Sequence, residues 1–105
     1  HDNNTLIGWL KTDITPALRK AVADLVRADV RKPEEIAEHL IGFAYASNAR
    51  LAVIPMQDLL GLDGSCRMNT PGTSEGNWRW CMRPEEFKKL DAKKLRALTE
   101  HFGRC

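Results

Sequence analysis

One short apolar run limits what this chain can fold into by itself. Residues 51–55 read Leu-Ala-Val-Ile-Pro, a continuous apolar segment that ends at a proline. Such a run is typical of a strand that is buried on both faces in a parallel sheet. Continuation of a preceding helix is disfavoured because Pro55 would lie in its interior. A single strand leaves two unpaired edges. The sequence therefore predicts an incomplete α/β protein, or one that is completed by association.

Two amphipathic helices are predicted before this run. Thr15 is a suitable N-cap and Pro16 a suitable first residue for a helix over 16–30. Pro33 begins a second helix over 33–48, with two acidic residues in its first turn. The apolar positions expected to face inward are Leu18, Val22, Leu25 and Val26 in the first helix, and Ile36, Leu40, Phe43 and Ala44 in the second.

A long polar loop over 61–83 follows, rich in Gly, Ser, Asn and Thr. Loops of this length inside a domain are usually functional or disordered. Trp78 and Trp80 make disorder less favourable, since free linkers contain few aromatic residues. Helical structure then resumes at Pro84. Asp91 is expected to cap a second helical piece, and Gly103 to end it.

Composition excludes several classes of partner. The 105 residues suffice for one domain, and 16 Lys and Arg against 14 Asp and Glu give a net charge of only +2. This balance provides no basic stripe for nucleic acid. No apolar run approaches the ~18 residues that a membrane span requires. We therefore expect neither a nucleic-acid partner nor a membrane partner.

The residues alone point to no cofactor or metal. The chain contains no phosphate-binding loop, no serine–histidine–aspartate arrangement and no metal-ligand cluster. Cys66, Cys81 and Cys105 are odd in number and lack C-x-x-C spacing, so they are expected to be inert thiols. One cysteine would be left over from any disulfide, which favours a cytoplasmic location.

Three segments resemble one enzyme family. Residues 1–9 read HDNNTLIGW, residues 55–62 read PMQDLLGL, and residues 67–73 read RMNTPGT, followed by NWRW at 77–80. In this order they resemble motifs of the amylomaltases, the 4-alpha-glucanotransferases of the alpha-amylase clan. The resemblance extends over essentially the whole chain.

The resemblance implies a fold class. Amylomaltases contain a (β/α)₈ TIM barrel with inserted subdomains. Residues 1–105 would then be the C-terminal segment of the catalytic barrel, about its last quarter. We expect an α/β protein that is mostly helical in this fragment, with one buried strand near 51–55.

The resemblance also implies an activity and site residues. The family transfers α-1,4-glucan segments between maltooligosaccharides by a retaining mechanism. By resemblance, Asp2 is the carboxylate that stabilises the transition state, and His1 contacts hydroxyls of the same sugar. Asn69 is expected to contact the glucan substrate. Gln57 and Asp58 complete the predicted substrate-binding set, with a supporting or structural role favoured for both.

Trp78 and Trp80 are expected to pack the loop against the rest of the chain, and this role is favoured over stacking on sugar rings. The family's nucleophile and its acid/base are expected upstream of His1, so the isolated chain should be inactive. Exposed apolar faces of the 51–55 strand and of the helices over 16–30 and 33–48 are expected to make the fragment self-associate. The alternatives are a non-enzymatic, self-associating helical module or remnant, and a hydrolytic relative of the same clan.

Overall fold

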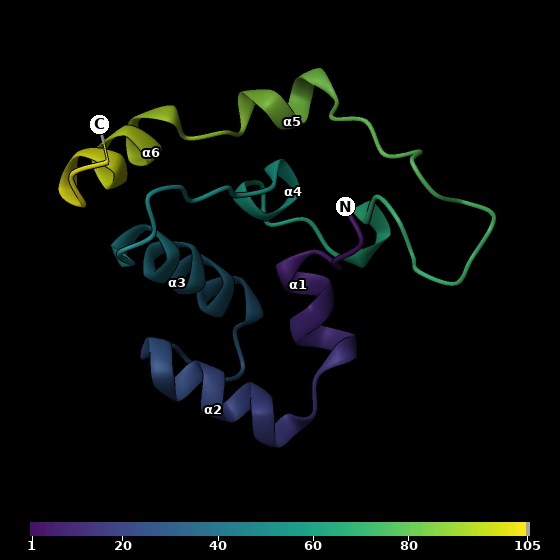
Figure 1. Ribbon diagram of the computed structural model, residues 1–105, viewed down its shortest axis with the longest axis horizontal. Coiled ribbons are helices and arrows are strands. Elements are labelled where there is room, and N and C mark those ends of the chain that lie inside the picture. The colour runs from purple at the N-terminus through teal and green to yellow at the C-terminus, as the bar shows by residue number, and fades with distance from the viewer. Residues whose placement is uncertain (105) are drawn as a thin grey trace.

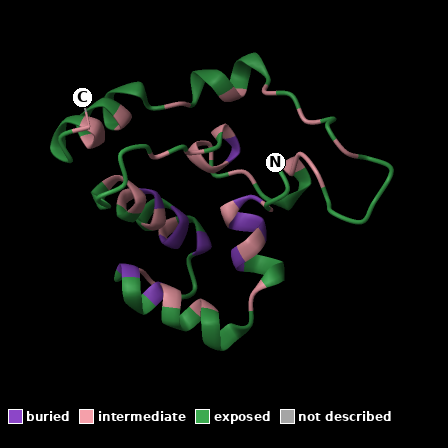
Figure 2. Cartoon of the chain, in the orientation of Figure 1, coloured by how far each residue is buried: buried purple, intermediate pink, exposed green. Residues whose placement is uncertain are grey.

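The first helices of the chain share one apolar core. A computed structural model describes residues 1–104. In it α1 (Leu6–Gly8) continues into the π-helical segment η1 (Trp9–Asp13), and α2 (Pro16–Val26) and α3 (Pro33–Ala46) follow. Figure 1 shows these helices arranged around a common centre. Figure 2 shows that each of these helices contains buried residues. The core cluster consists of Ile7, Leu10, Ala23, Val26, Ile36 and Ala37.

The predicted helix starts are confirmed. The Thr15 hydroxyl accepts the N–H of Leu18 at 3.2 Å, and Pro16 is the first residue of α2. Pro33 likewise begins α3. Each start depends on groups within one turn of the chain, namely a capping hydroxyl or a proline that lacks the N–H left unbonded at a helix N-terminus.

The predicted end of the first helix is wrong by four residues. The helix ends at Val26 because Arg27 adopts the left-handed conformation, with φ 56° and ψ 45°. The N–H of Ala28 donates to the carbonyl of Ala23 at 2.9 Å, and that of Arg27 to Asp24 at 3.3 Å. This pair of hydrogen bonds is a Schellman motif, with Arg27 in the position that usually holds glycine.

Part of each predicted apolar face is exposed. Leu25 of α2 is 64% exposed and Phe43 of α3 is 56% exposed. The buried residues of α3 include Ile36, Ala37 and Ile41. The prediction of a buried Phe43 is therefore wrong. The three-helix core is too small to cover the outer side of α3.

The predicted buried strand at 51–55 is also wrong. No strand occurs in residues 1–104, and this segment is irregular. Leu51 is 77% exposed and Val53 is 76% exposed. A strand needs a neighbour to accept and donate its backbone hydrogen bonds. The described part of the chain offers it none, so the segment connects α3 to α4 without regular structure, and Ala52 and Ile54 are only half-buried.

The second half of the chain contains shorter helices and longer irregular segments than the first half. It contains α4 (Met56–Leu59), the 3₁₀ turn η2 (Gly64–Cys66), α5 (Pro84–Lys88) and α6 (Ala92–His101). The loop from 67 to 83 swings out on one side, and α5 and α6 lie along the upper edge of Figure 1. None of the helices in the described range is long and apolar enough to cross a membrane.

The predicted limits of the last helix are confirmed. The Asp91 carboxylate accepts the N–H of Lys94 at 2.9 Å, as an N-cap does. At the other end Gly103 has φ 64°, and the N–H of Arg104 donates to Thr99 at 2.9 Å. Glycine adopts this backbone conformation without the steric cost that a Cβ brings.

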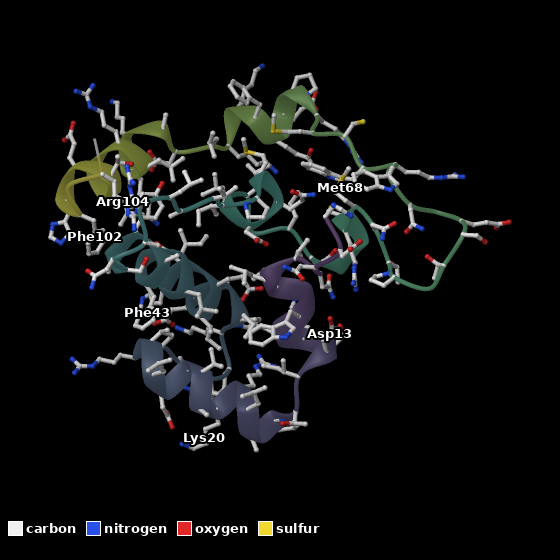
Figure 3. The ribbon with its side chains drawn as sticks, in the orientation of Figure 1. Asp13, Lys20, Phe43, Met68, Phe102 and Arg104 are labelled. Carbon is white, nitrogen blue, oxygen red and sulfur yellow. The ribbon has the colours of Figure 1, made fainter. Side chains whose placement is uncertain are left out.

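A single arginine joins α6 to the end of α3. Arg104 donates from Nε to the carbonyl of Tyr45 at 2.7 Å and from Nη2 to that of Ser47 at 2.9 Å. Figure 3 shows Arg104 beside the end of α3. These carbonyls belong to the last turn, where helices leave acceptors unsatisfied. An ion pair between Lys94 and Glu38 forms a second link.

Candidate active site

The N-terminal dipeptide and the loop after η2 meet in space. The Asn69 carboxamide donates from Nδ2 to Oδ1 of Asp2 at 2.7 Å. His1 Nε2 lies 3.2 Å from the same oxygen, and both side chains of this pair are 58% exposed. Three of the predicted site residues, separated by 67 positions along the chain, are therefore in contact. The His1 and Asp2 side chains are accessible to a ligand, and Asn69 is half-buried beside them.

Arg67 fixes the two backbones that carry these side chains. Its Nη2 donates to the carbonyl of Asp2 at 2.6 Å, and its Nε donates to the carbonyl of Asn69 at 2.7 Å. The planar guanidinium can make such contacts in a fixed relative geometry. Sequence reasoning missed Arg67 as a site residue. It stands in the RMNTPGT motif, but its role requires two segments 65 positions apart.

The site rests on the first turn of α1. The Thr5 hydroxyl caps this turn by accepting the N–H of Gly8 at 3.1 Å. The N–H of Leu6 donates to Oδ1 of Asp58 at 2.7 Å. Asp58 is half-buried, and this burial raises the pKa of its carboxyl, while the Leu6 N–H acts in the opposite direction. A carboxylate from α4 thus holds the helical turn that follows His1 and Asp2.

Gln57 supports the other half of the site. Its side chain is buried, and Nε2 donates to the carbonyl of Cys66 at 3.3 Å, directly before Arg67. The neighbours Gln57 and Asp58 therefore each hold one of the two segments that meet at Asp2. These contacts agree with the supporting role favoured from the sequence. Their direct contact with substrate stays a prediction.

The loop also brings an aromatic ring to the site. The rings of His1 and Trp78 lie with centroids 4.9 Å apart and planes tilted by 40°. Trp78 is 58% exposed, so the predicted role of packing the loop down is wrong for this residue. A single flat ring at the edge of the loop has no core beneath it in which to bury. Trp80 is half-buried.

An open hollow of about 990 Å³ borders this cluster. His1, Asp2 and Arg67 line its polar part, and its apolar part includes Leu40 and Ile54. The stick view places Met68, another lining residue, near the N-terminal segment (Figure 3). Within residues 1–104, no group of three or more His, Cys, Asp or Glu could hold a metal ion. The arrangement suits hydrogen bonding to a hydroxyl-rich ligand.

Comparison with known proteins identifies the family. The sequence profile of the family described as 4-alpha-glucanotransferase matches residues 1–88. The chain belongs to this family. Among its relatives, the chloroplastic/amyloplastic 4-alpha-glucanotransferase of Solanum tuberosum is 43% identical over 107 residues, which covers 99% of this chain and 18% of that protein. The Thermus thermophilus 4-alpha-glucanotransferase is 41% identical over 104 residues, covering 95% of this chain and 20% of that protein. The family resemblance predicted from the sequence is confirmed.

A solved structure supports the same relationship. The amylomaltase from Streptococcus agalactiae, solved in complex with acarbose, matches with a TM-score of 0.87 and 31% sequence identity. The match covers 99% of this chain and 20% of the amylomaltase chain. The segment therefore spans about a fifth of the length of the relatives that it matches. Its helices adopt the arrangement of the corresponding part of an amylomaltase.

Proposed function

We propose that this segment is the C-terminal part of the catalytic barrel of a 4-alpha-glucanotransferase, which transfers α-1,4-glucan segments between maltooligosaccharides. The contact of Asp2 with Asn69 and His1 carries this proposal. It joins residues from two of the segments that resemble family motifs into one exposed polar cluster. Membership in the family supports the reaction class.

In this proposal Asp2 acts on the charge that develops during glycosyl transfer. Retaining enzymes of this type pass through an oxocarbenium-like transition state on the way to a glycosyl-enzyme intermediate. Hydrogen bonds from sugar hydroxyls to the Asp2 carboxylate strengthen as positive charge grows on the ring. They therefore lower the barrier more than they tighten ground-state binding. His1 and Asn69 contact the same sugar and orient it.

The remaining catalytic groups lie outside this chain. The nucleophilic carboxylate and the general acid/base match no residue of this sequence, so the isolated chain is inactive. The acids of α3 and α5 lie in the first turn of each helix, where they suit the helix dipole, and they do not replace these catalytic groups. Transfer is favoured over hydrolysis because the relatives are named as glucanotransferases. The reaction requires no cofactor, and its location is the cytoplasm.

The test uses the complete protein that contains this segment. We expect it to release glucose from maltotriose and to form longer maltooligosaccharides. Asp2→Asn should lower kcat about 100- to 1000-fold, the effect of removing one group that stabilises transition-state charge. Asp24→Asn, on the exposed side of α2, is the matched control and should leave kcat unchanged. Full activity of Asp2→Asn would exclude Asp2 from the mechanism.

A second candidate is a non-enzymatic module that self-associates. The exposure of Leu51, Val53 and Phe43 favours it, since apolar side chains in this number on one small chain attract a partner. The two candidates differ in the reading frame upstream of His1. A frame encoding further barrel strands, with an Asp and a Glu at strand ends, supports the enzyme. A start codon beside His1 supports the module.

A further inference from the structure

Trp78 has a backbone conformation that its side chain does not favour. Its φ is +60°, in the left-handed region, where a bulky residue with a Cβ is uncommon. The ring is 58% exposed, so burial of the indole does not compensate for this conformation. Residues kept in such conformations cluster at functional sites, where the surroundings hold them in place. The surroundings of Trp78 provide such a restraint.

The loop before Trp78 is closed by a single side chain. Asn77 accepts the N–H of Thr70 through Oδ1 at 2.8 Å, and its Nδ2 donates to the carbonyl of Thr73 at 3.1 Å. The Trp78 N–H then donates to the carbonyl of Met68 at 2.6 Å. These hydrogen bonds hold residues 77 and 78 beside residues 68–73, and so beside Asn69. They present the indole beside the Asp2 cluster before any ligand is bound.

The contact with His1 defines where the indole lies in the site. The imidazole and the indole are neighbours with centroids 4.9 Å apart, and the imidazole also approaches Asp2 Oδ1. The indole therefore lies within reach of a glucan whose one ring is held by the Asp2 carboxylate. The C–H faces of a glucose linked to that ring would need an apolar surface. The large, exposed indole provides such a surface.

We propose that Trp78 is a substrate-binding residue, whose indole forms the platform for the glucose residue next to the one held by Asp2. This inference rests on the proposed glucanotransferase function. The loop from 67 to 78 then has two roles. Asn69 contributes a polar contact to one sugar, and Trp78 an apolar contact to its neighbour. The left-handed backbone at Trp78 turns the ring toward the glucan.

The experiment compares inhibitors of different length on the complete protein by titration calorimetry. Acarbose contains several linked rings, whereas 1-deoxynojirimycin is a single-ring analogue of glucose. Trp78→Asn removes the indole with a residue that tolerates the left-handed backbone. It should weaken acarbose binding about tenfold and change 1-deoxynojirimycin binding less than twofold. Trp78→Phe retains an aromatic surface and should preserve most of the acarbose affinity. Trp80→Phe is the control for loop aromatics and should change neither.

Three outcomes would overturn the proposal. Equal weakening of both inhibitors by Trp78→Asn would assign Trp78 to the support of His1 alone. Unchanged binding of both would show that the indole contacts no sugar. Weak acarbose binding by Trp78→Phe, with thermal stability unchanged, would show that an aromatic surface is not what the site requires. Failure of the proposed function has a different signature, since the unaltered protein would then release no glucose from maltotriose and bind neither inhibitor.

Discussion

Gly8 allows the first turn of α1 to approach the η2 turn closely. A Cβ added there would lie 2.4 Å from Oδ1 of Asn4 and 2.8 Å from the Cα of Gly64. The first turn of α1 and the η2 turn would have to separate. Gly8→Ala should therefore lower the free energy of unfolding of the 105-residue chain by about 1–3 kcal/mol, as overpacking does.

Gly42 provides the matched control for this prediction. It lies inside α3, and an added Cβ meets nothing within 4 Å. Gly42→Ala should raise the free energy of unfolding by about 0.5–1 kcal/mol, because alanine has the higher helix propensity. Urea unfolding followed by circular dichroism measures both variants. Similar effects of Gly8→Ala and Gly42→Ala would contradict the close approach of α1 to η2.

Asp58 gives the chain a predictable response to pH. Burial raises the pKa of its carboxyl above the ordinary value of 3.8, so the folded chain binds this proton more tightly than the unfolded chain. The contribution of Asp58 to stability is then full below pH 3.8 and is lost as the pH rises through the raised pKa. Asp58→Asn keeps an oxygen for the Leu6 N–H but does not titrate. From pH 3.5 to pH 7 the variant should gain stability relative to the unaltered chain.

Asp63 provides the control, because its pKa shifts in the direction opposite to that of Asp58. Hydrogen bonds from Ser65 lower the pKa of the Asp63 carboxyl. Its contribution to stability is present above pH 3.8 and is lost as the pH falls through the lowered pKa. Relative to the unaltered chain, Asp63→Asn should therefore lose stability between pH 3.5 and pH 7. Urea unfolding at several pH values checks both slopes, and slopes of the same sign for the two variants would refute the assignment at Asp58.

Arg104 connects two helices that otherwise touch little. Its guanidinium bonds to the carbonyls at the end of α3 at 2.7 and 2.9 Å, and the Lys94–Glu38 pair is the other polar link to α6 among the described contacts. Removal of the Arg104 side chain breaks these hydrogen bonds and allows α6 to move away from α3. In Arg104→Ala we expect amide hydrogen exchange over 93–101 to become several-fold faster, with exchange in α2 unchanged.

Arg96→Ala is the control for this prediction. Arg96 is 82% exposed and pairs with Glu100 inside α6 itself. Exposed pairs of this kind contribute about 0.3–0.5 kcal/mol to a helix, so the exchange rates should change little. Equal acceleration in Arg96→Ala and Arg104→Ala would mean that the intrinsic stability of α6, and not its link to α3, controls exchange.

The elements that sequence predicted well are those decided within one turn. The Thr15 hydroxyl, the Pro16 ring and the Asp91 carboxylate each act on backbone groups a few positions away, so their roles are visible in the sequence. The strand at 51–55 was wrong because strand formation depends on a distant partner, which periodicity does not specify. The left-handed end of α2 at Arg27 carried no glycine to indicate it.

In the candidate site, too, the contacts between residues far apart in the chain could not be predicted from local patterns. Periodicity and spacing alone provided no reason to place Asn69 beside Asp2, because their contact spans 67 positions. The family resemblance supplied that pairing, since it identified two motifs known to share a site. It did not supply Arg67, whose hydrogen bonds go to backbone carbonyls and leave no signature in residue type. Contacts of this kind become visible only when the two segments are folded together.

The molecule exposes more surface than a self-contained domain of its mass. Its accessible surface is 7662 Å². A compact monomer of 11.9 kDa would expose about 5,900 Å². The radius of gyration is 14.5 Å, against about 13 Å for a compact chain of this length. This excess of about 1,700 Å² on one chain is about twice the ~800 Å² that each partner buries in a standard protein–protein interface. Exposed apolar side chains on this surface include Leu25, Phe43, Leu51 and Val53, which are suited to packing against further protein.

This surface predicts the behaviour of the isolated chain. In water, 77% exposed Leu51 and 76% exposed Val53 favour burial against another copy. Light scattering should therefore give a mass above 11.9 kDa. The double variant Leu51→Lys with Val53→Lys should shift the mass toward the monomer, because charged lysine side chains resist burial against another copy. Asn48→Lys with Ala49→Lys adds the same charge to neighbouring exposed positions and should leave the association intact. A monodisperse monomer of the unaltered chain would show that these apolar side chains tolerate water, and that the excess area does not drive association.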